Sequence, residues 1–310
     1  MNSNIICVVG PTASGKTALA VELALRLGGE VLSCDSMQIY RGMVIGTAAP
    51  DAAEMRGVPH HLLGVLDPAE PCSAGRYVAM ADPILRDILD RGKAAVLCGG
   101  TGLYLDSLMA GRTFAPRPAS GRREELEHMA DTQGVEAVRA YLATFDPESA
   151  ARLHPSDRRR IIRAAEIYLE TGRTMTQHDR ESRAIPPKYT GRWLGLDFAD
   201  RSDLYGRIDR RVEQMMERGL LEEVRGLLAR GVPRGATSLQ AIGYKELIAH
   251  LDGRCTLAEA VETIQRESRR YAKRQRTWFR RNPAVHWIEQ AGPPDAGAVL
   301  ADALAYLAEA

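Results

Sequence analysis

Four polar residues carry side chains suited to chemistry on a phosphorylated substrate. Lys16 and Thr17 end the segment Gly10-Pro11-Thr12-Ala13-Ser14-Gly15-Lys16-Thr17, while Asp35 and Thr101 each follow an apolar run. A lysine ammonium can neutralise phosphate oxygens, and a threonine hydroxyl can ligate Mg²⁺. An aspartate carboxylate is ionised near neutral pH and can accept a proton. These residue types predict a site for a polyphosphate, a metal ion and a general base.

The segment from Gly10 to Thr17 matches the P-loop pattern G-x-x-x-x-G-K-[ST]. It lies between an apolar run at 5–9, which we expect to be a strand, and an amphipathic run at 18–25, which we expect to be a helix. In such a loop the backbone N–H groups at the helix start bind phosphate oxygens, so all eight residues are candidate phosphate ligands. The flanking strand and helix disfavour a chance glycine-rich turn. ATP, GTP and a diphosphate ester would satisfy the pattern equally.

Asp35 and Thr101 both follow segments that we expect to be parallel strands, at 30–34 and 93–98. Ligands of parallel sheets gather at the carboxyl ends of the strands. Asp35 can act there as a general base, hold Mg²⁺ indirectly, or cap the following turn. Thr101 can donate to a phosphate or to a substrate amine, or cap the next helix. Their positions alone leave these alternatives open.

Strands and helices alternate in the first 115 residues, which predicts an α/β core. The expected strands are 5–9, 30–34, 60–66 and 93–98, with a helix at 74–91. This order favours a P-loop-type fold, with a mostly parallel sheet and helices on both faces.

The pattern changes at 116–187, where the helical periods at 122–133, 134–145 and 158–171 have no strand between them. We expect an all-helical insertion there, with proline-marked boundaries at Pro116, Pro118, Pro186 and Pro187. Residues 188–310 would complete the core with strands at 193–198 and 285–288. Helices are expected at 201–219, 220–230, 239–250, 257–281 and 297–309.

Composition favours a cytoplasmic enzyme. No apolar run approaches the ~18 residues that span a bilayer, and the start Met1-Asn2-Ser3-Asn4 lacks the basic residues of a signal peptide. The five cysteines are scattered without a CxxC pair, which indicates neither a disulfide framework nor a zinc site. We expect a monomer that does not bind membranes.

Positive charge is concentrated locally although the net charge is only +1. Between Arg266 and Arg281 eight cations stand against the single acid Glu267, and Arg158-Arg159-Arg160 with Arg163 forms a second cluster. Charged helix faces are usually solvated, but cations without compensating acids favour a polyanionic partner. Tyr271, Trp278 and Phe279 within the first cluster could stack on bases or belong to the core.

Seven segments in this order and spacing resemble the tRNA dimethylallyltransferases. They are Gly-Pro-Thr-Ala-Ser-Gly-Lys-Thr (10–17), Asp-Ser-Met-Gln-Ile-Tyr (35–40), Ile-Gly-Thr-Ala (45–48), Gly-Gly-Thr-Gly-Leu-Tyr (99–104), His-Pro-Ser-Asp (154–157), Leu-Gln-Ala-Ile-Gly-Tyr-Lys-Glu (239–246) and Arg-Tyr-Ala-Lys-Arg-Gln-Arg-Thr-Trp-Phe-Arg (270–280). The resemblance covers nearly the whole chain. No Cys/His ligand set follows Cys255, so the zinc-finger tail of eukaryotic relatives is missing and the chain resembles the bacterial form.

The resemblance implies transfer of a dimethylallyl group from dimethylallyl diphosphate to N6 of the adenine 3′ of the anticodon, in tRNAs reading codons that begin with U. It implies that Asp35 is the base and that Thr101 hydrogen-bonds at the reaction centre. Lys16, Arg207 and Mg²⁺ at Thr17 would stabilise the leaving diphosphate. No separate ATP is required.

The resemblance also implies that the adenine is flipped out and that the insertion closes over the anticodon stem. The positions it assigns to tRNA binding are Asp35, Ser36, Met37, Gln38, Thr101, Arg123, Arg159, Arg160, Ile161, Ile162, Arg163, Arg269, Lys273, Arg276 and Arg280.

Three other functions share some of these features. A small-molecule kinase would use the same loop and Asp35 with ATP, and the cations at 158–163 could form its lid. An isopentenyltransferase acting on free adenine nucleotides would need neither the insertion nor the basic helix. A non-catalytic RNA-binding P-loop protein is disfavoured, because Lys16, Asp35 and Thr101 converge at one expected sheet edge.

Overall fold

The computed structural model describes residues 4–112, 114 and 120–309. The chain divides into two compact units, Met1–Met109 with Tyr189–Ala310, and Ala110–Lys188. Residue 116, where we expected the insertion to begin, lies outside the described residues, as do Pro118 and the first three residues of the chain.

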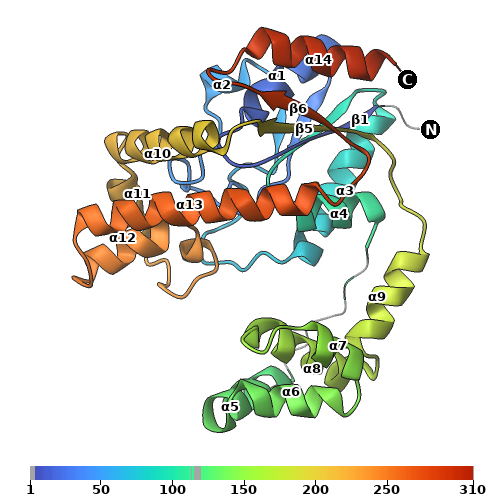
Figure 1. Cartoon of the computed structure of the whole chain (residues 1–310), viewed down its shortest axis with the longest axis vertical. Coiled ribbons are helices and arrows are strands. Elements are labelled where there is room, and N and C mark those ends of the chain that lie inside the picture. The colour runs from blue at the N-terminus through green and yellow to red at the C-terminus, as the bar shows by residue number, and fades with distance from the viewer. Residues whose placement is uncertain (1–3, 113, 115–119, 310) are drawn as a thin grey trace. The chain divides into compact units, whose positions relative to one another are not determined.

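The first unit is built on a parallel sheet of six strands (Figure 1). Its spatial order is β3-β2-β4-β1-β5-β6, so β1 is central and paired to β4 and β5. The strands are β1 (Ile5–Val9), β2 (Glu30–Ser33), β3 (His60–His61), β4 (Ala95–Cys98), β5 (Arg192–Phe198) and β6 (Val285–Gln290). The expected parallel α/β core is confirmed.

Successive residues of a strand point to opposite faces of the sheet, so the apolar strands make both faces hydrophobic. Helices cover each of these faces. Ile5, Cys7 and Val9 enter one hydrophobic cluster, whereas Ile6 and Val8 enter another. The second cluster is closed by α1 (Lys16–Leu27) and α14 (Ala296–Ala308), which lie together in Figure 1. The first cluster is closed by α3 (Ala74–Asp90), α4 (Gly102–Ala110), α11 (Leu220–Ala229), α12 (Tyr244–Leu251) and α13 (Leu257–Phe279).

The remaining helices of the first unit are α2 (Ala52–Met55), α10 (Arg201–Glu217) and the short 3₁₀ helix η1 (Ser238–Gln240). The described part of the second unit contains α5 (Arg122–Gln133), α6 (Val135–Ala143), α7 (Pro147–Arg152), α8 (Arg158–Thr171) and α9 (Met175–Ala184). It has its own hydrophobic core, formed mainly by α5, α6 and α8.

Five elements differ clearly from the sequence-based expectation: β3, α12 and the short helices α2, α7 and α9. The strand expected at 60–66 stops at His61, because Leu62 and Gly64 have φ angles of 62° and 58°, which an extended strand cannot contain. The helix expected at 239–250 begins only at Tyr244, after Gly243 with φ 99°. The short helices α2, α7 and α9 were not expected, and each is capped by an aspartate or threonine side chain.

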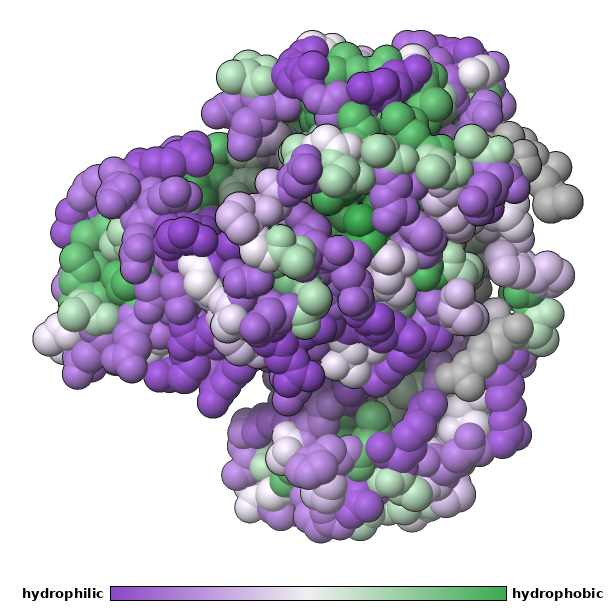
Figure 2. Space-filling view, turned by 45° about the horizontal axis from the view of Figure 1, so that its top comes forward, coloured by the Kyte–Doolittle hydropathy of each residue, from purple (hydrophilic) through white to green (hydrophobic). Residues whose placement is uncertain are grey.

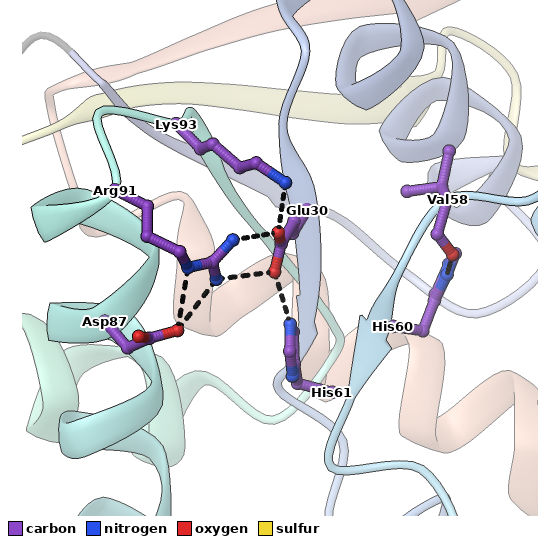
Figure 3. Close-up of polar contacts among 7 residues, drawn as sticks. All are labelled: Glu30, Val58, His60, His61, Asp87, Arg91 and Lys93. Atoms are coloured by element: carbon purple, nitrogen blue, oxygen red, sulfur yellow. Dashed lines mark hydrogen bonds and ion pairs between the residues drawn. The ribbon is translucent and has the colours of Figure 1, made fainter.

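A charge network fixes the amino end of β2, opposite to the end that carries Asp35 (Figure 3). The buried Glu30 carboxylate accepts hydrogen bonds from Arg91, from Lys93 Nζ at 2.7 Å and from His61 Nε2 at 2.8 Å. Arg91, followed by the other donors, holds the pKa of Glu30 well below its usual range. His60 instead bonds to the Val58 carbonyl at 2.8 Å, so both histidines have structural partners.

The surface seen in Figure 2 is mostly hydrophilic, with hydrophobic atoms in small separate patches. Among the described helices, none combines the length and the apolar character that crossing a membrane requires.

Candidate active site

Two adjoining cavities open at the carboxyl edge of the sheet. The larger, of about 1140 Å³, is lined by the phosphate loop, Asp35, the end of β4 and the arginines of α10. The smaller, of about 310 Å³, has many apolar lining residues from α10, α11 and the segment 240–243. Six residues line both cavities and so mark where they meet: Thr12, Asp35, Thr47, Arg211, Met215 and Tyr271.

The phosphate loop joins β1 to the amino end of α1, as the sequence predicts. Gly10 and Gly15 have φ angles of 139° and 92°, and a Cβ at Gly10 would lie 2.3 Å from the Leu196 carbonyl oxygen. Lys16 Nζ donates to the Pro11 carbonyl at 2.5 Å, which holds the ammonium over the loop. Burial lowers the pKa of Lys16 to about 8, with Cys98, Arg211 and Asp35 as smaller influences. The loop therefore presents a partly desolvated cation next to the backbone N–H groups of a helix start.

Helix α10 places a row of arginines opposite this loop. Arg207 Nε donates to the Ala13 carbonyl at 2.9 Å, and its guanidinium lies 5.5 Å from the centre of the Phe198 ring. Arg210 and Arg211, one turn further along, also line the larger cavity. Burial lowers the pKa of Arg211, and the nearby Asp35 opposes that shift. Of these three arginines only Arg207 was predicted, although helical spacing from it would have found the other two.

Asp35 fills one of the three roles that its position left open, that of a turn cap. Its Oδ1 accepts from the backbone N–H groups of Met37 at 2.8 Å and Gln38 at 3.2 Å, so it caps the turn after β2. The residue also lines both cavities. Capping fixes one carboxylate oxygen and thereby orients the group toward the place where the cavities meet.

Thr101 lies beside Asp35 and holds the same turn. Its Oγ1 accepts from the Ser36 N–H at 3.0 Å and donates to Ser36 Oγ at 3.3 Å. Tyr271 of α13 lines both cavities beside Asp35. Burial, followed by the charge of Asp35, raises the pKa of Tyr271 to about 12, so its hydroxyl stays protonated at neutral pH.

Gln275 of α13 is a site residue that the sequence analysis missed. Its Oε1 accepts from the Thr12 N–H at 2.8 Å, and its Nε2 donates to the Gly100 carbonyl at 3.0 Å. A Cβ on Gly100 would lie 2.0 Å from Gln275, and one on Gly102 would lie 2.2 Å from the Trp278 ring. Gly100 and Gly102 thus leave space for the side chains of Gln275 and Trp278 from α13. This packing explains why segments 99–104 and 270–280 both carry the family resemblance.

The expectation that the cations of α13 lack compensating acids is wrong. The acids come from other elements: Asp209 pairs with Arg269, and the fully buried Asp197 accepts from Arg276 at 2.8 Å and Arg280 at 3.2 Å. In the part of the chain that the structure describes, Lys273 and Arg274 have no such acidic partner, and both are exposed. Four cations of this segment were predicted to bind tRNA. Two of them, Arg276 and Arg280, instead form ion pairs with Asp197 of β5 and so stabilise the fold.

The cluster on α8 also divides into structural and exposed members. Ile161 and Ile162 are buried in the core of the second unit, so the side chains of these two members pack inside the protein. Arg123 and Arg163 both bond the carboxylate of Glu166, at 3.4 and 2.7 Å. Arg159 and Arg160 are exposed.

A magnesium ion would find few ligands from the protein itself. No group of three His, Cys, Asp or Glu residues suited to a metal is found among the described residues. Thr17 and Asp35 line the larger cavity together with the phosphate loop. Mg²⁺ commonly takes one or two protein ligands and completes its shell with water and substrate phosphates, so these residues fit the ion only together with a bound diphosphate.

Comparison with models of protein families shows which family this chain belongs to. The model described as IPP transferase matches residues 38–282, and the isopentenyl transferase model matches residues 3–64. This chain belongs to the IPP transferase family. Its predicted resemblance to the tRNA dimethylallyltransferases is thereby confirmed.

Relatives and solved structures of this family match the chain over nearly its whole length. A tRNA dimethylallyltransferase of Halalkalibacterium halodurans is 47% identical over 93% of this chain and 92% of its own, and one of Bacillus subtilis is 46% identical over 94% and 92%. The crystal structure of a tRNA isopentenylpyrophosphate transferase from Bacillus halodurans has a TM-score of 0.74 at 43% identity, covering 99% of this chain and 96% of that chain. A eukaryotic dimethylallyltransferase described as acting on tRNA has a TM-score of 0.83 at 27% identity, covering 98% and 79%.

Proposed function

We propose that this IPP transferase moves a dimethylallyl group from dimethylallyl diphosphate to N6 of the adenine 3′-adjacent to the anticodon, in tRNAs reading codons that begin with U. The observation that carries the proposal is the position of Asp35, which lies where the cavity at the phosphate loop meets a second, smaller cavity. An anion cradle, a carboxylate base and room for a second substrate are the three parts that such a transfer needs.

The phosphate loop would bind the diphosphate through its backbone N–H groups. Lys16 and Arg207 each donate to a carbonyl of this loop and would stabilise the charge that grows on the leaving diphosphate. Mg²⁺ held at the Thr17 hydroxyl would supply further positive charge to the same oxygens.

Asp35 would take the proton of the adenine amine. The bond between C1 of the prenyl group and the diphosphate oxygen breaks, and a bond from C1 to N6 forms. The N6 lone pair is delocalised into the purine, so a positioned base must accept the proton as the new bond develops. Thr101 and Tyr271 hold the turn and the wall around this carboxylate.

The tRNA would be bound through exposed cations of both units. Lys273 and Arg274 on α13, and Arg159 and Arg160 on α8, have side chains available for phosphates. Arg274 also lines the smaller cavity, and its guanidinium lies 5.6 Å from the Tyr271 ring centre, so it connects the surface to the site.

A transfer assay tests this proposal. Purified protein is incubated with Mg²⁺, labelled dimethylallyl diphosphate and unmodified tRNA, with AMP as an alternative acceptor and ATP as an alternative donor. We expect label on N6 of the adenine next to the anticodon and none on AMP. Label on AMP but not on tRNA would establish the free-nucleotide enzyme instead, and ATP-dependent phosphorylation would establish a kinase.

A further inference from the structure

The segment Val44–Ala48 forms a wall of both cavities but has no part in the proposed chemistry. Ile45, Thr47 and Ala48 line the larger cavity, and Gly46 and Thr47 line the smaller. The segment is a turn closed by its own backbone bonds, from Ala48 N to the Ile45 carbonyl and from Ala49 N to the Val44 carbonyl, both at 3.0 Å. The N–H groups at its start point away from these bonds and need partners from other elements.

One carboxylate on α11 binds three successive backbone N–H groups of this loop. Glu223 Oε2 accepts from Val44 N at 2.9 Å and from Ile45 N at 2.8 Å, and Oε1 accepts from Gly46 N at 3.1 Å. The buried Tyr244 hydroxyl donates a fourth hydrogen bond to Oε1 at 2.6 Å. Bonds to an ionised acceptor are stronger than neutral ones, so Glu223 is a strong anchor for the loop.

Tyr244 also explains why the loop contains Gly46. A Cβ at Gly46 would lie 2.5 Å from the Tyr244 ring and 2.8 Å from Leu220 Cδ1. The distinctive segments 45–48 and 239–246 therefore contact each other, and Glu223 is hydrogen-bonded to both of them.

The carbonyl groups of the loop are held from the opposite side by Gln38. Its Nε2 donates to the Thr47 and Ala48 carbonyls at 3.3 and 3.2 Å, while its Oε1 accepts from Ser33 Oγ at 3.1 Å. Gln38 is itself bonded through its N–H to Asp35. The loop is thus tied directly to the turn that carries the proposed base.

We propose that Glu223 is a positioning residue for the transfer reaction, since it fixes Val44–Ala48 as the wall beside Asp35. This inference rests on the proposed function. Glu223 is not among the residues that line the two cavities, so it would act through the loop, by setting how closely the donor carbon and the acceptor amine approach where the cavities meet. Small displacements at a reacting centre can cost about 10²-fold in rate while leaving binding largely intact.

The test compares three full-length variants with the wild type in the transfer assay. Glu223→Gln keeps the size of the side chain, but it removes the charge and turns an NH₂ donor toward backbone N–H groups. Tyr244→Phe removes one of the four donors. Glu222→Gln, one residue away, disturbs only an exposed ion pair with Arg225 and is the matched control.

We expect kcat to fall about 10- to 100-fold in Glu223→Gln and by less in Tyr244→Phe. The Kd for an unreactive dimethylallyl diphosphate analogue and the Kd for tRNA should change less than about threefold, and Glu222→Gln should match the wild type. Unchanged turnover in Glu223→Gln would overturn the proposal. Equal losses of binding and turnover would also overturn it, because they would indicate a general structural role.

Where Glu223→Gln does not fold, Tyr244→Phe decides the matter. It must lower kcat with binding preserved, and a normal kcat would overturn the proposal. Labelling of tRNA by the wild-type protein distinguishes a failure of this inference from a failure of the proposed function. A wild type that labels no tRNA refutes the proposed function, whereas labelling by the wild type and equally by the variants refutes only the role of Glu223.

Discussion

Gln275 accepts a hydrogen bond from the Thr12 N–H at 2.8 Å, although the two residues are 263 positions apart in the sequence. The same amide donates to the Gly100 carbonyl at the end of β4. A single buried side chain of α13 therefore connects the phosphate loop to the strand end that carries Thr101. Gln275 therefore fixes the position of the basic helix α13 relative to the phosphate loop.

Replacing Gln275 by glutamate should weaken binding of dimethylallyl diphosphate. The carboxylate keeps an acceptor for Thr12, but it leaves the Gly100 carbonyl without its donor and places negative charge beside the anion cradle. An unsatisfied buried group costs about 1–3 kcal/mol, so we expect KM for the donor to rise about 5- to 100-fold. Gln265→Glu on the same helix is the control. Equal donor KM values in the two variants would contradict this role of Gln275.

The donor kcat/KM should fall as the pH rises above about 8. Burial lowers the pKa of Lys16 to about 8, so the free enzyme loses this positive charge at higher pH. The pH profile of kcat/KM reports groups of the free enzyme. In Lys16→Arg, whose guanidinium stays charged, the alkaline fall should disappear. A wild-type profile that stays flat through this range would show that Lys16 does not titrate there.

Asp35→Asn should separate the two roles of Asp35. The amide oxygen can still accept from Met37 and Gln38, so the cap remains, but the base is lost. We expect turnover to drop about 10²-fold or more while thermal stability and tRNA affinity change little. Asp35→Ala should lose the cap as well, with a further cost in stability of about 1 kcal/mol. Near-normal turnover in Asp35→Asn would show that another group is the base.

The cations of α13 should divide into two classes. Lys273→Ala should weaken tRNA binding and reduce the slope of log K against log salt by about one, the signature of one lost phosphate contact. Arg276→Ala should instead mainly destabilise the fold, since it leaves the buried Asp197 with fewer partners. The measurements are filter-binding titrations at several salt concentrations and thermal unfolding. An equal salt slope for wild type and Lys273→Ala would contradict this division.

Glu30 should make stability sensitive to acid without affecting catalysis. Its folded-state pKa is depressed by Arg91 and its other partners, so its contribution is present above the ordinary pKa of 4.5 and is lost as the pH falls below that value. At neutral pH, Glu30→Gln should reduce the free energy of unfolding by about 1–3 kcal/mol and leave kcat unchanged. Asp87→Asn, which changes an exposed partner of Arg91, is the control. A wild-type acid transition identical to that of Glu30→Gln would contradict the prediction.

Much of the fold could be predicted because its signals are local. The apolar run at 5–9, the glycines and lysine of the phosphate loop, and the helical periods of α3, α8 and α13 are all visible within a short window of sequence. The same holds for Lys16, Asp35 and Thr101, because each follows a predicted strand and the carboxyl ends of parallel strands meet.

The sequence could not predict which distant residues neutralise or hold one another. A charge count from Arg266 to Arg281 found only Glu267, whereas Asp197 comes from β5 and Asp209 from α10. Glu223 and Gln275 carry no local signal of their roles, because their partners are backbone N–H groups brought near by folding.

The sequence by itself determined the P-loop, the α/β class, the helical insertion and the family resemblance, since these depend on residue types at fixed short spacings. Only the tertiary structure decided which cations are already neutralised, which isoleucines of α8 are buried, and how Glu223 and Gln275 hold the walls of the site. Those properties depend on contacts across the sheet and between helices, and such contacts exist only once the chain has folded.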